Sequence, residues 1–218
     1  MSEPLRIIFM GTPEFAVPSL HALLDCPEQV VGVVCQPDCR KGRGKKLCPP
    51  SVKVLAEKAE IPVLQPTCIC NDAFFEEISA LKPDLIVVTA YGRILPGCLL
   101  NLPRLGIINV HGSLLPKYRG AAPIQWAVIN GETETGVTIM QMDEGVDTGD
   151  ILLPLSLPIT EEDTSGTLFQ KLADLGGQAL FEAISRIKQG DLPPTPQDDA
   201  LSCPAPMLKK EMGQLDWS

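Results

Sequence analysis

The chain has 218 residues, of which 44% are hydrophobic, so it can bury a large core within one α/β domain. Its formal net charge of −9 at pH 7 argues against a general nucleic-acid binder, because contacts to phosphates need positive charge. The first residues show no basic stretch before an apolar core, and no apolar run is long enough to span a membrane. We therefore expect a cytoplasmic protein without a signal peptide and without membrane contact.

The eight cysteines are scattered along the chain. The closest sets, Cys35 with Cys39 and Cys68 with Cys70, have neither a second close pair at zinc-site spacing nor a nearby histidine. A chain of this size and apolar content does not need disulfides to stabilise its fold. We expect reduced thiols and no metal site.

Continuous apolar runs alternate with helical patterns in the first half of the chain. Runs of this kind are typical of strands in a parallel sheet that is covered on both faces. The strands predicted here are 5–10, 30–34, 85–90 and 106–110, and the helices are 14–24, 51–60 and 72–81, with Asn71 as the N-cap of the last. The pattern predicts an α/β, Rossmann-like, doubly wound fold.

The second half of the chain has a different pattern. Two strands, 137–142 and 151–157, are separated by a loop too short for a crossover helix, which predicts antiparallel pairing. A long helix is predicted over 167–188, where the apolar side chains fall on one stripe. Gly176 and Gly177 weaken this helix locally and are typical of a close packing contact. We predict a domain over residues 1–190, followed by a Pro-rich linker or arm over 191–218.

The strand end near residue 110 carries the first candidates for chemistry. Asn109 and His111 lie two residues apart, so the strand period points both side chains to the same face. They end a strand at the carboxyl edge, where parallel α/β sheets bind their ligands. A lone histidine there is often structural, but the pair favours catalysis. The acidic loop 142–150 is a third candidate, although its local sequence does not show which carboxylate matters. Pro13 and the lack of G-x-G-x-x-G argue against a dinucleotide site after the first strand.

Three blocks resemble the formyltetrahydrofolate-dependent formyltransferases. Residues 109–116 resemble the active-site strand and folate-contacting loop of that family, residues 136–150 are similar to its second signature, and residues 93–95 resemble the end of its pteridine-slot strand. The resemblance implies the formyltransferase fold, with an antiparallel part and a long C-terminal helix. The catalytic residues that it implies are Asn109, His111 and Asp147. The implied folate contacts are Arg93, Ile94, Leu95, Ser113, Leu114, Leu115 and Pro116.

Further stretches, at 9–18, 42–47 and 119–127, are similar to the methionyl-tRNA branch of this family. The resemblance extends from Arg6 to Trp217. It implies formyl transfer from 10-formyltetrahydrofolate to the amino group of methionine on initiator tRNA, without a metal. Members of that branch continue past Trp217 into a β-barrel domain that helps to hold tRNA, and we expect that domain to be absent from this chain. We also expect a monomer.

The implied reaction needs few protein groups. Attack of the amine on the formyl carbonyl produces a tetrahedral oxyanion, to which Asn109 and protonated His111 can each donate a hydrogen bond. Asp147, if it lies beside His111, favours the imidazolium. The proton that leaves the amine reaches the departing folate nitrogen through His111 or a bound water.

A run of basic residues occupies positions 40–46 without an acidic residue among them. Composition alone is typical of a solvated loop. In an acidic protein, however, a concentrated positive patch is a natural place for an RNA backbone to dock. The resemblance implies a loop that reaches the acceptor end of the tRNA, with Arg43 as its best-placed contact. The predicted tRNA-binding residues are Arg40, Lys41, Arg43, Lys45 and Lys46.

Three alternatives stay open at this point. A formyltransferase of the same superfamily could act on an amino sugar or a nucleotide amine with the same chemistry. A 10-formyltetrahydrofolate hydrolase would release formate without an acceptor. A non-catalytic folate- or RNA-binding module would be expected to lack one of the three catalytic residues, and this chain has all three.

Overall fold

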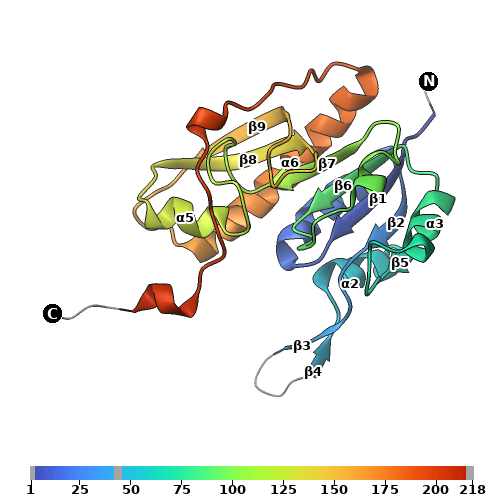
Figure 1. Cartoon of the computed structure of the whole chain (residues 1–218), viewed down its shortest axis with the longest axis horizontal. Coiled ribbons are helices and arrows are strands. Elements are labelled where there is room, and N and C mark those ends of the chain that lie inside the picture. Colours follow the sequence, from blue (N-terminus) through green and yellow to red (C-terminus); the bar gives the residue numbers. More distant parts are fainter. Residues whose placement is uncertain (1–2, 42–45, 215–218) are drawn as a thin grey trace.

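The computed structural model describes residues 3–41 and 46–214. Within these ranges, seven strands form one sheet in the order β5-β2-β1-β6-β7-β8-β9, and β3 and β4 form a separate hairpin that projects from the body of the domain (Figure 1). The strands are β1 (Arg6–Gly11), β2 (Gln29–Val34), β3 (Cys39–Lys41), β4 (Lys46–Cys48), β5 (Val63–Leu64), β6 (Leu85–Thr89), β7 (Ile107–His111), β8 (Glu134–Gln141) and β9 (Ile151–Pro158). The helices are α1 (Val17–Leu24), α2 (Ser51–Lys58), α3 (Asp72–Ala80), α4 (Gly97–Leu100), α5 (Pro123–Ile129) and α6 (Ser165–Gln189).

The sheet has a parallel part and an antiparallel part. Strands β5, β2, β1, β6 and β7 are parallel to one another, whereas β8 pairs antiparallel with both β7 and β9. The loop between β8 and β9 holds Asp147 and is too short to contain a crossover helix, which explains the antiparallel pairing. The predicted mostly parallel sheet with an antiparallel part is confirmed.

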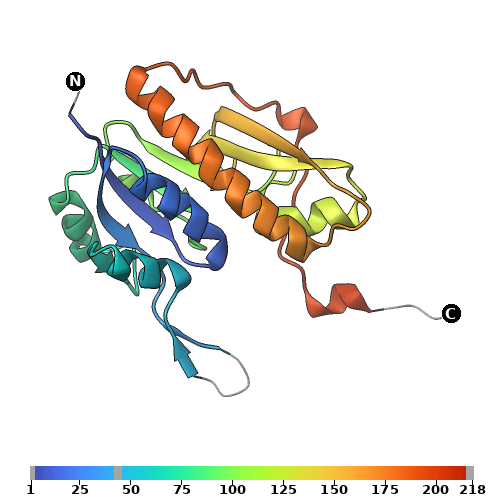
Figure 2. The same ribbon diagram turned by 180° about the vertical axis from the view of Figure 1, so that it is seen from behind.

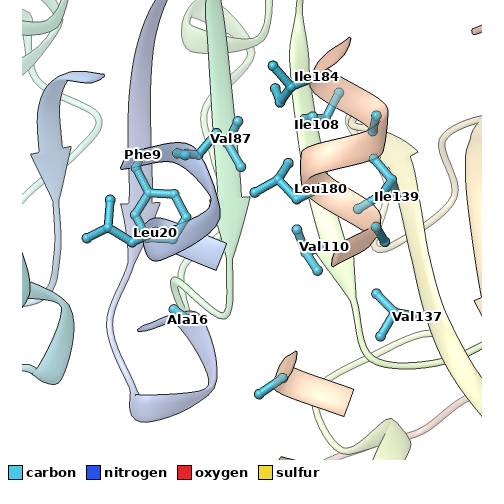
Figure 3. Close-up of a cluster of buried hydrophobic side chains, with 14 of the residues drawn as sticks. Phe9, Ala16, Leu20, Val87, Ile108, Val110, Val137, Ile139, Leu180 and Ile184 are labelled. Carbon is cyan, nitrogen blue, oxygen red and sulfur yellow. The ribbon is translucent and has the colours of Figure 1, made fainter. Parts of the chain in front are cut away.

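Consecutive residues of the central strands enter different hydrophobic cores. Phe9 and Val87 pack on one side of the sheet with residues of α1, α2 and α6 (Figure 3). Their neighbours Met10 and Val88 pack on the other side with residues of α3 and α4. A strand that is buried on both faces reads as a continuous apolar run, so the doubly wound arrangement follows from the sequence pattern.

Helix α6 lies across the face of the sheet next to α1 (Figure 2). Its first turn is capped by Thr164, whose side chain accepts a hydrogen bond from the Thr167 N–H, and it ends at Gly190, which has a φ of 71°. A Cβ on Gly176 would lie 2.9 Å from Cγ1 of Val110, and a Cβ on Gly177 would lie 2.9 Å from the carbonyl oxygen of Pro18. The close packing contact that the two glycines predict is confirmed.

Three local features differ from the prediction. The helix expected over 14–24 is a 3₁₀ turn, Glu14–Ala16, followed by α1, because Pro18 is accommodated only in the first turn of an α-helix. The two ends of the basic run belong to the paired strands β3 and β4, which are too short to show a period in the sequence. The Pro-rich arm is attached to the domain by bridges at Thr195 and Pro204, and its two 3₁₀ turns are Asp199–Leu201 and Lys210–Gly213. None of the helices in the described ranges is sufficiently long and apolar to cross a membrane.

The Gly177 contact leads to a stability prediction. Gly177→Ala places a methyl group against the backbone of α1, which cannot move as a flexible side chain could. We expect a net loss of about 1 to 2 kcal/mol in the free energy of unfolding, although alanine is the better helix former. The control is Gly166→Ala in the first turn of the same helix, where the new Cβ would be 3.6 Å from Thr164 Oγ1. Urea denaturation of both variants measures the effect, and a Gly177→Ala variant as stable as the control would contradict it.

Candidate active site

A cavity of about 540 Å³ opens at the carboxyl ends of β1, β6 and β7. Phe15 follows β1, residues 90–94 follow β6, and Asn109 and His111 belong to β7. The chain winds from β1 outward through β2 to β5 and then crosses back to β6, so β1 and β6 flank the point where the winding reverses. Open α/β sheets bind their ligands in the crevice at this point. The cavity is therefore the candidate active site.

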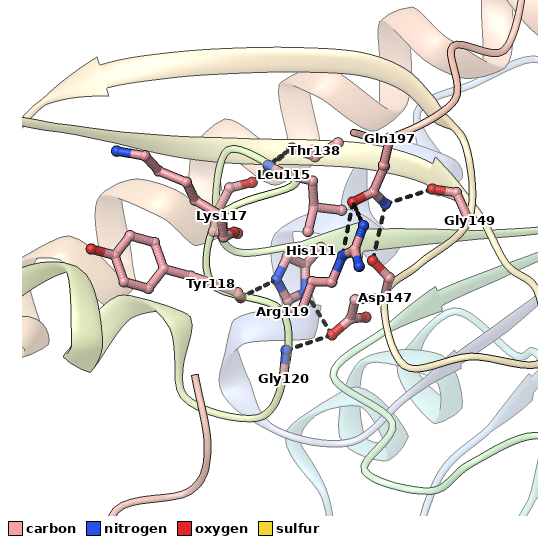
Figure 4. Close-up of polar contacts among 11 residues, drawn as sticks. His111, Leu115, Lys117, Tyr118, Arg119, Gly120, Thr138, Asp147, Gly149 and Gln197 are labelled. Carbon is pink, nitrogen blue, oxygen red and sulfur yellow. Dashed lines mark hydrogen bonds and ion pairs between the residues drawn. The ribbon is translucent and has the colours of Figure 1, made fainter. Parts of the chain in front are cut away.

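His111 ends β7 and is buried, with a fractional exposure of 5%. Its Nε2 lies 2.9 Å from the carbonyl oxygen of Tyr118. A carbonyl oxygen can only accept, so Nε2 carries a proton and donates it to Tyr118. Nδ1 faces the carboxylate of Asp147, with 3.6 Å to Oδ2 (Figure 4). Nδ1 is consequently the ring nitrogen that makes no hydrogen bond to another described residue.

Asp147 reaches the cavity from the loop between β8 and β9. Its Oδ2 accepts a hydrogen bond of 2.8 Å from the Gly120 N–H, and the same oxygen is the one that faces His111. Asp147 has a φ of 54°, which is uncommon for a residue with a side chain. The carboxylate therefore joins two loops, and its position depends on contacts that hold an unfavourable backbone conformation.

Asn109 lies two residues before His111 on the same strand and also lines the cavity. Its side chain is half-buried, and its amide makes no hydrogen bond with another residue in the described ranges. An amide in this position is available to donate to an oxygen of a bound molecule. The structure thus brings Asn109, His111 and Asp147 to one cavity, and their catalytic roles stay a prediction.

The structure places two of the seven predicted folate residues in the described cavity wall. Arg93 and Ile94 line the cavity, and Arg93 Nη1 also donates to the carbonyl oxygens of Pro66 and Thr67, at 3.2 and 3.0 Å. The other five are not among the described residues of the cavity wall. Leu95 is buried in the core beneath α3 and α4. The other four predicted folate residues outside the cavity wall lie in the loop after His111 and are Ser113, Leu114, Leu115 and Pro116.

The loop after His111 is held against β8, which explains why its side chains do not reach the cavity. Thr138 of β8 is fully buried, and its hydroxyl donates to the Ser113 carbonyl oxygen at 2.7 Å and accepts from the Leu115 N–H at 3.1 Å. The Ser113 hydroxyl donates to the Lys117 carbonyl oxygen at 2.7 Å. These bonds shape the turn that leads to Tyr118, and they thereby help to place the Tyr118 carbonyl oxygen against His111 Nε2.

Much of the cavity wall is apolar and comes from elements that are distant in the sequence. Phe15 and Phe169 meet edge to face with ring centroids 5.2 Å apart, and Ile124 of α5 lines the same wall. Met207 of the C-terminal arm also lines the cavity. Sequence reasoning missed these residues because single apolar side chains in separate helices carry no local signal. It also missed Tyr118 and Gly120, which act through backbone groups.

Three of the predicted tRNA-binding residues belong to the strands of the β3–β4 hairpin and are not among the described residues of the cavity wall. Arg40 on β3 and Lys46 on β4 are exposed, and Lys41 ends β3. Arg43 and Lys45 lie outside the residues that the structure describes.

The hairpin base is fixed to the domain by a cluster of polar side chains. Lys53 Nζ lies 2.9 Å from Asp38 Oδ1 and 2.8 Å from Gln65 Oε1, and Gln65 Nε2 donates to Asp38 at 2.8 Å. The hydrogen bond from Gln65, and then the bond and charge of Lys53, lower the pKa of Asp38. The pKa of Lys53 is raised by its hydrogen bond to Asp38. The ion pair is present over the neutral range, so the two strands leave the domain from a defined point.

No three His, Cys, Asp or Glu side chains within residues 3–41 and 46–214 are grouped as metal ligands. The cysteines described there form no disulfide with one another, and burial raises the pKa of Cys35 to about 11.

Residues 5–184 match the family model described as formyl transferase. The chain belongs to this family. Methionyl-tRNA formyltransferase from Desulfotalea psychrophila is 63% identical over 216 residues, which cover 99% of this chain and 67% of that protein. The same enzyme from Citrifermentans bemidjiense is 56% identical over 214 residues, covering 98% of this chain and 67% of that protein. The chain therefore spans about two thirds of the length of these curated relatives, and the resemblance to formyltransferases inferred from the sequence is confirmed.

The fold is also that of solved formyltransferases. An N-formyltransferase from Helicobacter canadensis, in complex with folinic acid and dTDP-3-aminofucose, superposes with a TM-score of 0.73 at 24% identity. The superposition covers 93% of this chain and 71% of that chain. At this identity the similarity shows the fold alone, and it confirms the formyltransferase fold predicted from the sequence.

The buried hydroxyl of Thr138 gives a prediction for the loop that follows β7. Thr138→Val keeps the shape of the side chain but leaves the Ser113 carbonyl and the Leu115 N–H without their partner. We expect a loss of about 2 to 4 kcal/mol in the free energy of unfolding. Thr138→Ser keeps the hydroxyl and should cost about 1 kcal/mol for the lost methyl group. Denaturant titration of the two variants tests this, and equal losses would show that the hydroxyl is not the stabilising group.

Proposed function

We propose that this chain transfers a formyl group from a 10-formyltetrahydrofolate donor to the α-amino group of methionyl-tRNA. The observation that carries the proposal is the meeting of Asn109, His111 and Asp147 at one cavity, in a chain 63% identical to a methionyl-tRNA formyltransferase. An amide donor, an imidazole and a carboxylate can together stabilise the oxyanion and move the proton in acyl transfer to an amine. The proposal also assigns the chain to translation initiation.

Asn109 and His111 stabilise the negative charge that forms when the amine attacks the formyl carbonyl. Asn109 donates from an amide that has no other partner among the described residues, and His111 donates from Nδ1 when it is protonated. Donors that are already in place cost no reorganisation during the reaction, and each contributes about 10² to 10³ in rate. An α-amino group with a pKa of roughly 8 is partly neutral near pH 7, so it needs no strong base to become a nucleophile.

His111 also moves the proton. The attacking amine loses a proton as the new C–N bond forms, and the leaving nitrogen gains one as the old bond breaks. Nε2 is held by the Tyr118 carbonyl, so Nδ1 is the atom from which protonated His111 gives its proton to the leaving nitrogen and through which it recovers the proton of the attacking amine. Asp147 stabilises the positive charge of the protonated ring, because its Oδ2 lies 3.6 Å away.

The donor fits the cavity by size and chemistry. A volume of about 540 Å³ lies within the range of small-molecule sites, and the apolar wall suits a flat ring system. Arg93 and Ile94 would hold the ring portion at the end of β6, and the folate, when bound, supplies an activated formyl group. The Helicobacter canadensis N-formyltransferase of the same fold was solved in complex with folinic acid, which is consistent with a folate as the donor.

The acceptor reaches the same cavity through its methionyl end, and the basic hairpin is the proposed contact for its RNA. The phosphate backbone needs positive charge, and the run at 40–46 concentrates it in a chain with a net charge of −9. We therefore propose that the β3–β4 hairpin contributes to tRNA binding.

Replacement of either hydrogen-bond donor to the oxyanion tests the proposed mechanism of formyl transfer. We expect His111→Ala and Asn109→Ala each to lower kcat for formylation of Met-tRNA by about 10² to 10³. His21→Ala, which changes the exposed histidine of α1, is the control and should keep full activity. Assays with amino-sugar nucleotides, and with no acceptor at all, compare formyl transfer with its alternatives. Near-normal turnover of His111→Ala, or transfer to an amino sugar in preference to Met-tRNA, would reject the proposal.

The role of the β3–β4 hairpin in tRNA binding is tested by the KM for Met-tRNA. Arg43→Ala removes one cation from the basic run, and we expect a higher KM for Met-tRNA with an unchanged KM for the formyl donor. Lys82→Ala removes an exposed cation that follows α3 and is the matched control. The KM difference should shrink as salt is raised, because phosphate contacts are screened. Equal losses with Met-tRNA and with a methionine ester would show that Arg43 does not contact the RNA.

A further inference from the structure

The C-terminal arm returns to the active site after α6 (Figures 1 and 2). Thr195 pairs with Ile151 through two backbone hydrogen bonds of 2.8 Å. Further along the arm, the Ala205 N–H donates to the Arg119 carbonyl oxygen at 2.7 Å, and the Ala205 carbonyl oxygen accepts from the Ala122 N–H at 3.0 Å. The segment between these two attachments is held at both ends, and Gln197 lies within it.

Gln197 uses its whole side-chain amide to connect two loops (Figure 4). Its Nε2 donates to the carbonyl oxygens of Asp147 and Gly149, at 2.9 and 2.6 Å. Its Oε1 accepts from Nε and Nη2 of Arg119, at 3.0 and 2.8 Å. Nη2 of Arg119 also pairs with Asp199 of the arm at 2.8 Å. One half-buried side chain therefore satisfies two carbonyls of one loop and the guanidinium of the other.

The two loops that Gln197 joins are those that orient the proposed catalytic pair. The loop of Arg119 provides the Tyr118 carbonyl that holds His111 and the Gly120 N–H that holds Asp147. The other loop provides Asp147 itself, in a backbone conformation that is uncommon for a non-glycine residue. A small rotation of this loop would change the separation of 3.6 Å between Asp147 Oδ2 and His111 Nδ1.

We propose that Gln197 is a positioning residue for formyl transfer, which sets the orientation of Asp147 toward His111. Gln197 is not among the described residues of the cavity wall, so it acts through Asp147 and not on the substrate. The inference rests on the proposed function and deepens it. It makes the Pro-rich arm a component of the active site instead of a simple connection.

Two substitutions of Gln197 distinguish its hydrogen bonds to the Asp147 loop from its hydrogen bonds to Arg119. Gln197→Ala removes all of them, whereas Gln197→Glu keeps an acceptor for Arg119 but turns a carboxylate oxygen toward two carbonyls. We expect both to lower kcat by about 10- to 100-fold, with unchanged KM for the donor and for Met-tRNA, since two hydrogen bonds to the loop are lost. Gln189→Glu, at an exposed position near the end of α6, is the matched control and should keep wild-type kcat. A Gln197→Glu variant with wild-type kcat would overturn the proposal.

A double-mutant cycle with Asp147→Asn distinguishes positioning from a general loss of structure. If Gln197 acts through the Asp147 carboxylate, Gln197→Ala should cost little further activity in the Asp147→Asn background, measured in single turnovers with excess enzyme. An equal loss in both backgrounds would overturn the proposal. Thermal unfolding of each variant shows whether it is folded at the assay temperature.

A measurement without substrate keeps this inference separate from the proposed function. The chain has two histidines, so the ring ¹⁵N signals of His111 can be assigned by comparison with His21→Ala. Gln197→Ala should shift the Nδ1 signal of His111, and Gln189→Glu should not. A wild-type chain that fails to formylate Met-tRNA would reject the proposed function, whereas an unshifted Nδ1 signal in Gln197→Ala would reject the positioning role.

Discussion

The site depends on one carboxylate oxygen. Oδ2 of Asp147 accepts from the Gly120 N–H and faces His111 Nδ1, so it joins the β8–β9 loop to the chain that follows β7. The opposite nitrogen of the ring is committed to the Tyr118 carbonyl, only two residues from Gly120. His111 is thereby held from both sides by one short segment and one acid. The ring has one orientation in this arrangement, and a donor must be in place before charge develops if it is to lower the barrier.

The fold produces this arrangement through the change from parallel to antiparallel strands. Parallel strands β1, β6 and β7 bring their carboxyl ends to one edge, which places Asn109 and His111 beside the point where the winding reverses. The antiparallel strands β8 and β9 then need only a short loop between them, and that loop carries Asp147 to the edge of β7. A fully parallel sheet would have required a crossover helix at this position. The antiparallel pair therefore supplies an acid where a helix would otherwise pack.

Cavity and core are continuous. Phe15, Ile124 and Phe169 line the cavity and also pack with the residues that attach α1, α5 and α6 to the sheet. An apolar wall of this kind excludes water from the reacting groups, which strengthens the hydrogen bonds and charges at the polar edge. Substitutions in the wall are consequently expected to affect stability as well as ligand binding, because the same side chains serve both.

The sequence by itself determined the elements that have a local signal. The continuous apolar strands, the Asn71 cap of α3 and the glycine pair of α6 each depend on backbone physics within a few residues, and the structure has them all. The strand period also placed Asn109 and His111 on one face. Tertiary structure decided the rest. The Ser113–Pro116 loop turns under β8 because Thr138 binds its backbone, and Leu95 is buried in the core, so these expected folate residues lie off the cavity wall.

The support of Asp147 could not be inferred from the sequence either. Tyr118 and Gly120 act through a carbonyl and an N–H, which every residue type except proline possesses, so their side chains do not indicate these contacts. Gln197 lies 50 residues from Asp147 in a Pro-rich stretch whose composition predicts only irregular structure. Local patterns describe how a chain folds over a few residues. Contacts between distant segments depend on where the whole chain places them, and only the three-dimensional structure shows that.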